Sequence, residues 1–149
     1  MLHKYQPIMA VMRLATWLAL VTSLALVGGI AGCAMPEAVS VKYGTSKLYS
    51  VAEMDQAIEA IKADFSALAG CTLYTLKYAG DERCKQELEC ANRDRSPNEL
   101  YTDCLVFDSV FRSPRSGGDA WEPNKLYYWS WILAKTKNGA WTVINKGYC

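Results

Sequence analysis

The sequence predicts an α+β domain in which a long N-terminal helix packs on a curved antiparallel sheet of about four strands, with a second, short helix. Three observations support this class. An amphipathic stripe with a helix-start signal begins near residue 50, a shorter charged helical segment covers residues 81–92, and the last third holds three strands joined as a meander. We therefore expect one domain over residues 48–149.

The long helix is predicted from its start signal and its apolar periodicity. Ser50 and Glu53 form the pattern of a capping box, with Tyr49 and Met54 at the positions of a hydrophobic staple. Apolar side chains then recur at three- and four-residue intervals, and Gly70 supplies a stop signal. The pattern predicts a helix of about eighteen residues with one buried face.

Strands are predicted where β-forming residues alternate between two faces. One strand covers residues 71–78, and three more cover residues 100–112, 125–137 and 140–149. The last two are expected to form a hairpin, because Asn138-Gly139 is a frequent type I′ turn.

That turn also sets a register. It places Lys137 opposite Ala140, so that Leu133 and Ile144 share one face of the sheet.

The N-terminal segment has the three parts of a targeting sequence. Lys4 and Arg13 precede the uncharged apolar run 14–30, and the small residues Ala31-Gly32 lead to Cys33. Residues 1–32 therefore resemble a bacterial lipoprotein signal peptide, and Ile30-Ala31-Gly32-Cys33 resembles its lipobox. In such a box the cysteine thiol takes a diacylglycerol before cleavage, and further acylation, for example by palmitate, follows. The resemblance implies an extracytoplasmic chain anchored to the bacterial cell membrane by lipidated Cys33, with residues 33–47 as the tether.

Two other interpretations of the apolar run are an uncleaved transmembrane anchor and an ordinary secretory signal. The run has 17 residues and is interrupted by Gly28-Gly29. It is therefore short against the ~20 residues that span the hydrocarbon core. Either Met1 or Met12 can be the initiator methionine, since a start at Met12 gives a more usual leader length.

The charge balance and the histidine content exclude several classes of function. The chain of 149 residues has 16 Lys plus Arg and 15 Asp plus Glu, too even a balance for a nucleic-acid backbone reader. Its one histidine, His3, lies in the leader. A mature chain without histidine disfavours Ser-His-Asp hydrolysis, Cys-His chemistry and imidazole-bound zinc. We expect no cofactor and no metal.

Five cysteines remain after Cys33, and outside the cytoplasm they predict at most two disulfide bonds. Cys84 and Cys90 lie about 120° apart on a helix, so one of them is expected to bridge to Cys104 instead. Cys71 is the best candidate for a small buried thiol. The candidate disulfide cysteines are Cys84, Cys90, Cys104 and Cys149.

Several segments of the domain follow one another in a characteristic order. They are Phe65-(x)4-Gly70-Cys71-Thr72-Leu73, the strand segment 105–109, the loop 117–124, and the segments 128–133 and 139–148. In this order they resemble small bacterial secreted proteins and lipoproteins of a family of unknown function within the NTF2-like (cystatin-like) superfamily. The resemblance implies a curved sheet over a helix, often dimeric, with a pocket or concave face. It implies no agreed activity.

Large aromatic side chains suggest a ligand or partner surface. Trp and Tyr dominate binding hot spots, and Trp121 stands in the middle of a polar loop. Filling the core or a dimer interface is the alternative role for these side chains. The candidates are Trp121, Tyr127, Trp129, Trp131 and Tyr148.

A catalytic alternative uses carboxylates and a phenol. Asp103 or Asp108 beside Tyr101 would supply a general base and an oxyanion donor without histidine, as in NTF2-like isomerases. The spacing, however, puts the two aspartates on opposite faces of their strand. The loop before residue 125 also offers calcium ligands in Asp119 and Asn124 together with Glu122.

The function favoured by the sequence is a non-catalytic binding or assembly module on a lipid-anchored envelope protein, acting through a concave aromatic sheet face. The alternatives are a small isomerase or hydratase with an Asp/Tyr pocket, and an immunity-type or structural envelope protein. The expected partners are the membrane, a second copy of the chain or another envelope protein, and not nucleic acid.

Overall fold

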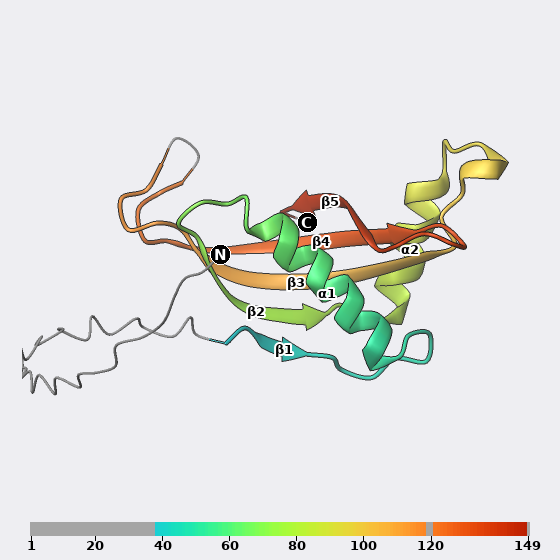
Figure 1. The fold of residues 1–149 in the computed structure, drawn as a ribbon, viewed down its shortest axis with the longest axis horizontal. Helices are drawn as coiled ribbons and strands as arrows, with labels where there is room; N and C mark the ends of the chain where they lie inside the picture. The colour runs from blue at the N-terminus through green and yellow to red at the C-terminus, as the bar shows by residue number, and fades with distance from the viewer. Residues whose placement is uncertain (1–37, 119–120, 149) are drawn as a thin grey trace, which may run out of the picture. The chain divides into compact units, whose positions relative to one another are not determined.

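The computed structural model describes residues 38–118 and 121–148. They form one five-stranded mixed sheet, in the order β1-β2-β3-β4-β5, with two helices (Figure 1). The sheet is open at both edges, and the α+β class is confirmed. The bounds are β1 Ser40–Lys42, α1 Val51–Phe65, β2 Thr72–Tyr78, α2 Asp81–Asn92, the one-turn 3-10 helix Pro97–Glu99, β3 Asp103–Arg112, β4 Leu126–Lys135 and β5 Thr142–Gly147.

Helix α1 begins at the capping box. The Ser50 hydroxyl accepts a hydrogen bond from the Glu53 backbone N–H (3.3 Å), and the Glu53 carboxylate accepts one from the Ser50 N–H (2.9 Å). The helix ends at Phe65 and has 15 residues, so it is shorter than predicted. Residues 66–69 continue as irregular turns, and Gly70 adopts a φ of 74° that favours glycine.

The strands present alternate side chains to α1. Phe65 packs edge-on against Phe111 with ring centroids 5.4 Å apart, and Phe107 and Trp131 lie opposite each other on the same face of β3 and β4. The side chains under α1 on this face are buried. The core side chains of this face, with those of α1, are Met54, Ala57, Ile58, Ile61, Phe65, Leu73, Leu76, Leu105, Phe107, Phe111, Tyr127, Trp131 and Leu133.

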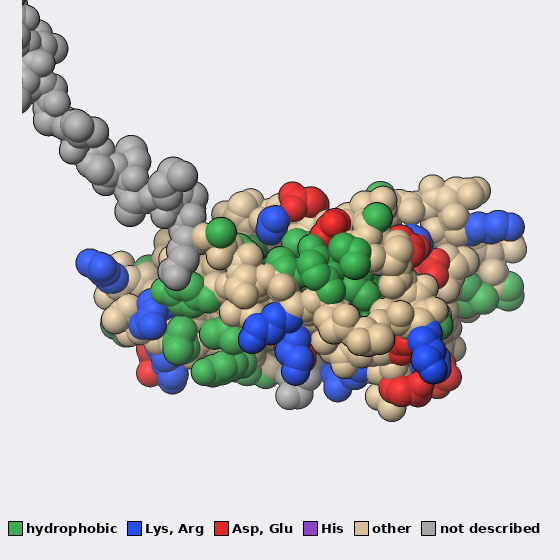
Figure 2. Space-filling view, turned by 90° about the horizontal axis from the view of Figure 1, so that it is seen from below, with side chains coloured by type: hydrophobic (Ala, Val, Ile, Leu, Met, Phe, Trp, Pro, Cys, Tyr) green, Lys and Arg blue, Asp and Glu red, His purple; other side chains and the backbone are tan. Residues whose placement is uncertain are grey.

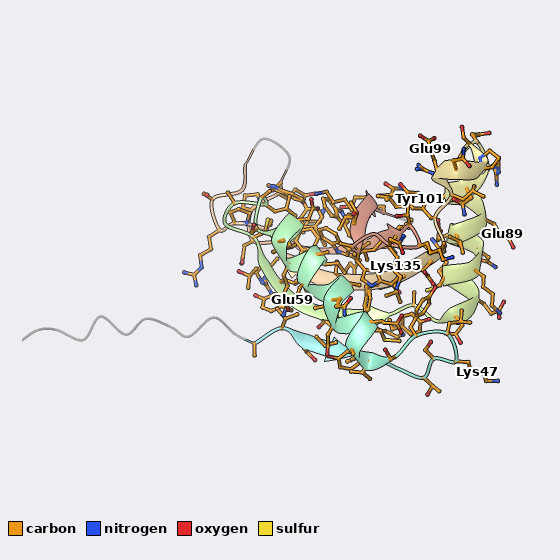
Figure 3. The ribbon with its side chains drawn as sticks, turned by 45° about the vertical axis from the view of Figure 1, so that its right-hand side comes forward. Lys47, Glu59, Glu89, Glu99, Tyr101 and Lys135 are labelled. Atoms are coloured by element: carbon orange, nitrogen blue, oxygen red, sulfur yellow. The ribbon has the colours of Figure 1, made fainter. Side chains whose placement is uncertain are left out.

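Helix α2 packs on the opposite face, at one end of the sheet. Its bounds are as predicted, and Cys84 is its fully buried residue. The Cys84 thiol lies against the backbone of Val106, and the helix borders Ile132 and Ile144. Figure 3 shows α2 standing at this end, with Glu89 pointing away from the sheet.

The sheet differs from the predicted four antiparallel strands by the addition of β1. This strand pairs parallel to β2, with Val41 opposite Leu76. It lies inside residues 33–47, which were predicted to be a tether, so the prediction is wrong for its second half. A three-residue strand is too short to show periodicity, but Val39, Val41 and Tyr43 pack on the core.

The β4–β5 connection differs from the predicted type I′ turn. The Gly139 N–H donates to the Thr136 carbonyl (2.9 Å), so Lys137 and Asn138 occupy the central positions, and neither has a positive φ. The predicted register holds from Ser130 opposite Gly147 to Ile132 opposite Asn145.

A bulge then shifts that register by one residue, so that Leu133 pairs with Val143. Ile144 therefore turns towards α2 and no longer shares the face of Leu133.

The capping box yields a stability prediction. We expect Ser50→Ala to lower the free energy of unfolding by about 1 kcal/mol, because the Glu53 N–H at the start of α1 loses its acceptor and the Glu53 carboxylate loses the hydroxyl that donates to it. Urea unfolding followed by tryptophan fluorescence measures this change. Ser116→Ala is the control, because the Ser116 hydroxyl contacts only its neighbour's carbonyl in an exposed loop. Equal losses in both variants would contradict the prediction.

Candidate functional site

The sheet face opposite α1 is covered by α2 at one end only. The rest is a shallow depression of about 470 Å³ that is open to solvent. We name this surface the open face. Its side chains come from β1 to β4 and are Lys42, Thr75, Lys77, Asp108, Val110, Tyr128 and Ser130. Figure 2 views the molecule from the β1 side and shows basic side chains beside hydrophobic ones.

Strand register arranges the open face in two rows. The first row runs across the strands through Lys42, Lys77, Asp108 and Ser130, each opposite the next. The second row runs through Ser40, Thr75, Val110 and Tyr128. Neighbouring side chains in a row are close enough to interact directly. The open face therefore combines a charged row with a row that ends in an exposed aromatic ring.

Asp108 is the carboxylate of the first row. Its Oδ1 accepts a hydrogen bond from the Ser130 hydroxyl at 2.7 Å, and the Asp108 side chain is exposed. Tyr128 lies in the adjacent row and is 61% exposed. A catalytic carboxylate is usually held in a pocket together with its substrate, whereas the Asp108 side chain lies exposed in an open depression. The geometry therefore suits binding better than proton transfer.

A second basic region continues the open face at the end away from α2. Arg112 Nε donates to the Tyr74 hydroxyl (3.1 Å), and its Nη1 donates to the backbone carbonyl of Asn124 (3.0 Å). These groups, with Arg115, line a polar depression of about 600 Å³. Arg112 is thus held in place by the chain itself, and Arg115 beside it is exposed.

The structure does not bring the proposed acid/base residues together. Tyr101 lies beside the 3-10 helix (Figure 3), where Arg95 stacks over its ring at 4.1 Å. Asp103 accepts a hydrogen bond from the Thr102 hydroxyl and lies 3.9 Å from Lys135. Asp108 is on the other face of β3, as the spacing predicted. These three residues therefore form no common pocket.

The aromatic candidates mostly fill the core. Trp131 is fully buried and Tyr127 is 8% exposed, so the prediction of an accessible surface is wrong for these two. Trp121 folds back from its loop and packs edge-on against Tyr127, with centroids 4.9 Å apart. Trp129 is half-buried in the same cluster, and Tyr148 is 72% exposed at its rim. A helix that ends early leaves room on its face of the sheet, and these rings occupy that room.

The four described cysteines are free thiols. Cys84 and Cys104 are buried, Cys71 is half-buried and Cys90 is exposed. The structure therefore lacks the predicted bridge from Cys84 or Cys90 to Cys104, while Cys33 and Cys149 lie outside the described residues. Burial raises the pKa of the Cys104 thiol to about 12 and also raises that of Cys84.

A polar cluster missed by the sequence analysis joins the loop before α1 to the start of α2. The Asp81 carboxylate accepts hydrogen bonds from the Ser46 hydroxyl (2.6 Å), the Tyr78 hydroxyl (2.6 Å) and the Lys47 backbone N–H (2.8 Å). The Ser46 bond, followed by the other two, lowers the pKa of Asp81 to about 2. Burial and the Asp81 contact raise the pKa of Tyr78. Because each donor is already used, this cluster is a structural clamp.

The described part of the calcium candidate loop is occupied by its own ion pairs and hydrogen bonds. Glu122 pairs with Lys125, and the Asn124 side-chain oxygen accepts from Arg112 (3.3 Å). Asp119 lies outside the described residues. Within residues 38–118 and 121–148, no three acidic, histidine or cysteine side chains group as metal ligands do. No helix in this part is long and apolar enough to span a bilayer.

Comparison of the chain with protein-family models, curated proteins and solved structures found no match.

The Asp81 clamp predicts a pH dependence of stability. Because the folded-state pKa of Asp81 is about 2, below its ordinary value of 3.8, its contribution is present above about pH 4. That contribution is lost as the pH falls towards 2. We expect Asp81→Asn to lose less stability than the wild type between pH 5 and pH 2, as measured by urea midpoints.

Glu82→Gln is the matched control for the clamp, because the exposed Glu82 carboxylate binds only Lys85 in the same turn. Its pH dependence should follow that of the wild type. A parallel pH dependence in wild type and Asp81→Asn would show that the clamp carries no protonation-linked stability.

Thiol burial predicts an order of reactivity in the reduced, folded chain. Iodoacetamide should modify Cys90 first, since its side chain is exposed, and Cys84 and Cys104 only after unfolding. Peptide mass spectrometry after timed labelling assigns each site. Modification of Cys104 at the rate of Cys90 in the native chain would contradict the described packing.

Proposed function

We propose that this chain is a bacterial lipoprotein, held on the outer side of the cell membrane by an acylated Cys33. The observation that carries the proposal is the segment Ile30-Ala31-Gly32-Cys33, which follows directly on an uncharged apolar run. Two or three acyl chains on one cysteine would hold the mature chain firmly at the bilayer. The domain would then work in the cell envelope.

The domain is proposed to be a non-catalytic binding module that uses the open face. Half of one sheet face is left without a covering element, and its exposed side chains include both lysines of the charged row and Tyr128. An apolar sheet face is normally covered by other elements of the fold. An uncovered face that carries charged side chains and an aromatic ring is suited to binding a partner. The isomerase alternative is less well supported, because Tyr101 and Asp103 are remote from Asp108.

The family proposal is a relationship to the NTF2-like superfamily. It is supported by the order of elements, in which α1 precedes the meander β2–β5 and packs on it. The parallel strand β1 and the cysteines of α2 and β3 are additions to that pattern. An immunity-type or structural envelope role would use the same open face.

The lipoprotein proposal is tested by Cys33→Ala. Without the thiol there is no acceptor for diacylglycerol, so the variant should accumulate as an unprocessed precursor without acyl label. Metabolic labelling with an alkyne fatty acid and a gel shift report both events. Cys90→Ala is the control and should be processed and labelled like the wild type. Normal labelling of Cys33→Ala would rule out this anchor.

A further inference from the structure

We propose that the open face binds the surface of an anionic lipid bilayer, so that the anchored domain lies with this face against its own membrane. The inference rests on the proposed lipid anchor at Cys33. It names the partner of the open face as clustered lipid headgroups that carry phosphate.

The charge of the open face supports an anionic partner. Lys42 and Lys77 stand side by side on β1 and β2, and Arg112 with Arg115 continues the basic surface along β3 and its following loop. Asp108 is the one carboxylate among the side chains that line these two depressions. The surface therefore has an excess of positive charge in a chain that is close to neutral.

Ion pairs occupy six cations elsewhere in the domain, while four others among the described residues, Lys47, Arg93, Arg95 and Lys137, form none. The cations on α1, α2, β4, β5 and the β3–β4 loop that form ion pairs are Lys62, Arg83, Lys85, Lys125, Lys135 and Lys146. Among the described residues, Lys42 and Lys77 of the open face and Arg112 and Arg115 of the second basic region form no ion pair. Asp108 lies opposite Lys77 and offsets part of this charge, so the two regions together keep a net positive charge towards an external partner.

The uncharged side chains of the open face suit a bilayer interface. Tyr128 and Leu126 are 61% and 38% exposed on β4, next to Val110 of β3. Tyrosine places an apolar ring and a polar hydroxyl at headgroup level, and lysine and arginine reach the phosphates with their long stems. The combination of basic and amphipathic side chains on one face is typical of interfacial binding.

The length of the tether brings this face to the membrane. Six residues lie between Cys33 and Ser40 of β1, and the seven steps from one Cα to the next allow a span of at most about 25 Å. The first row crosses from β1 to β4 over about 14 Å, given the usual strand spacing. Lys42 lies on β1 itself, at the edge where the tether enters. A short tether of this kind raises the effective concentration of the open face at the bilayer surface. A weak attraction between each cation and the lipid headgroups is then enough for binding.

The experiment uses the mature, lipidated full chain, added from detergent to preformed vesicles of phosphatidylcholine alone or with about one-third phosphatidylglycerol. Each lysine is then acetylated briefly, and peptide mass spectrometry compares the rates. Lys42 and Lys77 should react about fivefold or more slowly on the anionic vesicles, and high salt should remove the difference. Lys62 on α1, across the sheet, should react equally on both vesicles.

A charge-reversal pair tests the mechanism without loss of the reporter lysine. In Lys42→Glu/Arg115→Glu, the protection of Lys77 on anionic vesicles should fall towards the neutral-vesicle value. Lys62→Glu/Lys137→Glu makes the same change in net charge on exposed side chains elsewhere and should keep the protection of Lys77.

The outcomes separate this inference from the anchor on which it rests. A wild-type chain that fails to float with phosphatidylcholine vesicles overturns the lipoprotein proposal. A chain that floats, but whose Lys42 and Lys77 react equally on both vesicles, overturns the membrane contact and leaves a protein partner for the open face. Equal protection of Lys77 in both double variants also overturns it.

Discussion

The packing of α1 against Phe107, Phe111 and Trp131 is the contact on which the rest of the structure depends. It closes one face of the sheet, so the remaining secondary elements have only the other face to cover. Helix α2 covers one end of that face, and within residues 38–118 and 121–148 only the one-turn 3-10 helix Pro97–Glu99 follows it. The exposed, charged part of the sheet is therefore a result of having two helices for a five-stranded sheet.

The elements with long, regular patterns were predictable from the sequence. The capping box at Ser50, the limits of α2 and the alternation along β3 all agree with local rules, because neighbours in the chain decide them. Strand β1 was missed, since its pairing partner, β2, lies more than thirty residues away. The bulge after Ile132 was missed for a similar reason. Trp141, directly before β5, packs beside Tyr49, and such a tertiary contact cannot be seen in the local sequence of the hairpin.

The open face was only partly predictable. Alternation predicted that Asp103 and Asp108 lie on opposite faces of β3, but it could not show which face α1 covers or that α2 leaves Asp108 exposed. A binding surface was predicted from the aromatic side chains, but such side chains are common both in protein cores and in binding sites. Only the burial of Trp131 and Tyr127 separates these two roles. Likewise, the Asp81 clamp depends on a loop closing onto a helix start, which no local pattern announces.

The two edges of the sheet have a consequence for self-association. Long, flat edge strands add to one another and promote aggregation, whereas short or bulged edges do not. Here one edge is the three-residue β1, which ends in Lys42, and the other is β5, which is bulged against β4. Neither edge offers a regular ladder of free hydrogen-bonding groups. Strand addition by a second copy of the chain is therefore disfavoured at both edges, which leaves side-chain surfaces as the route to self-association.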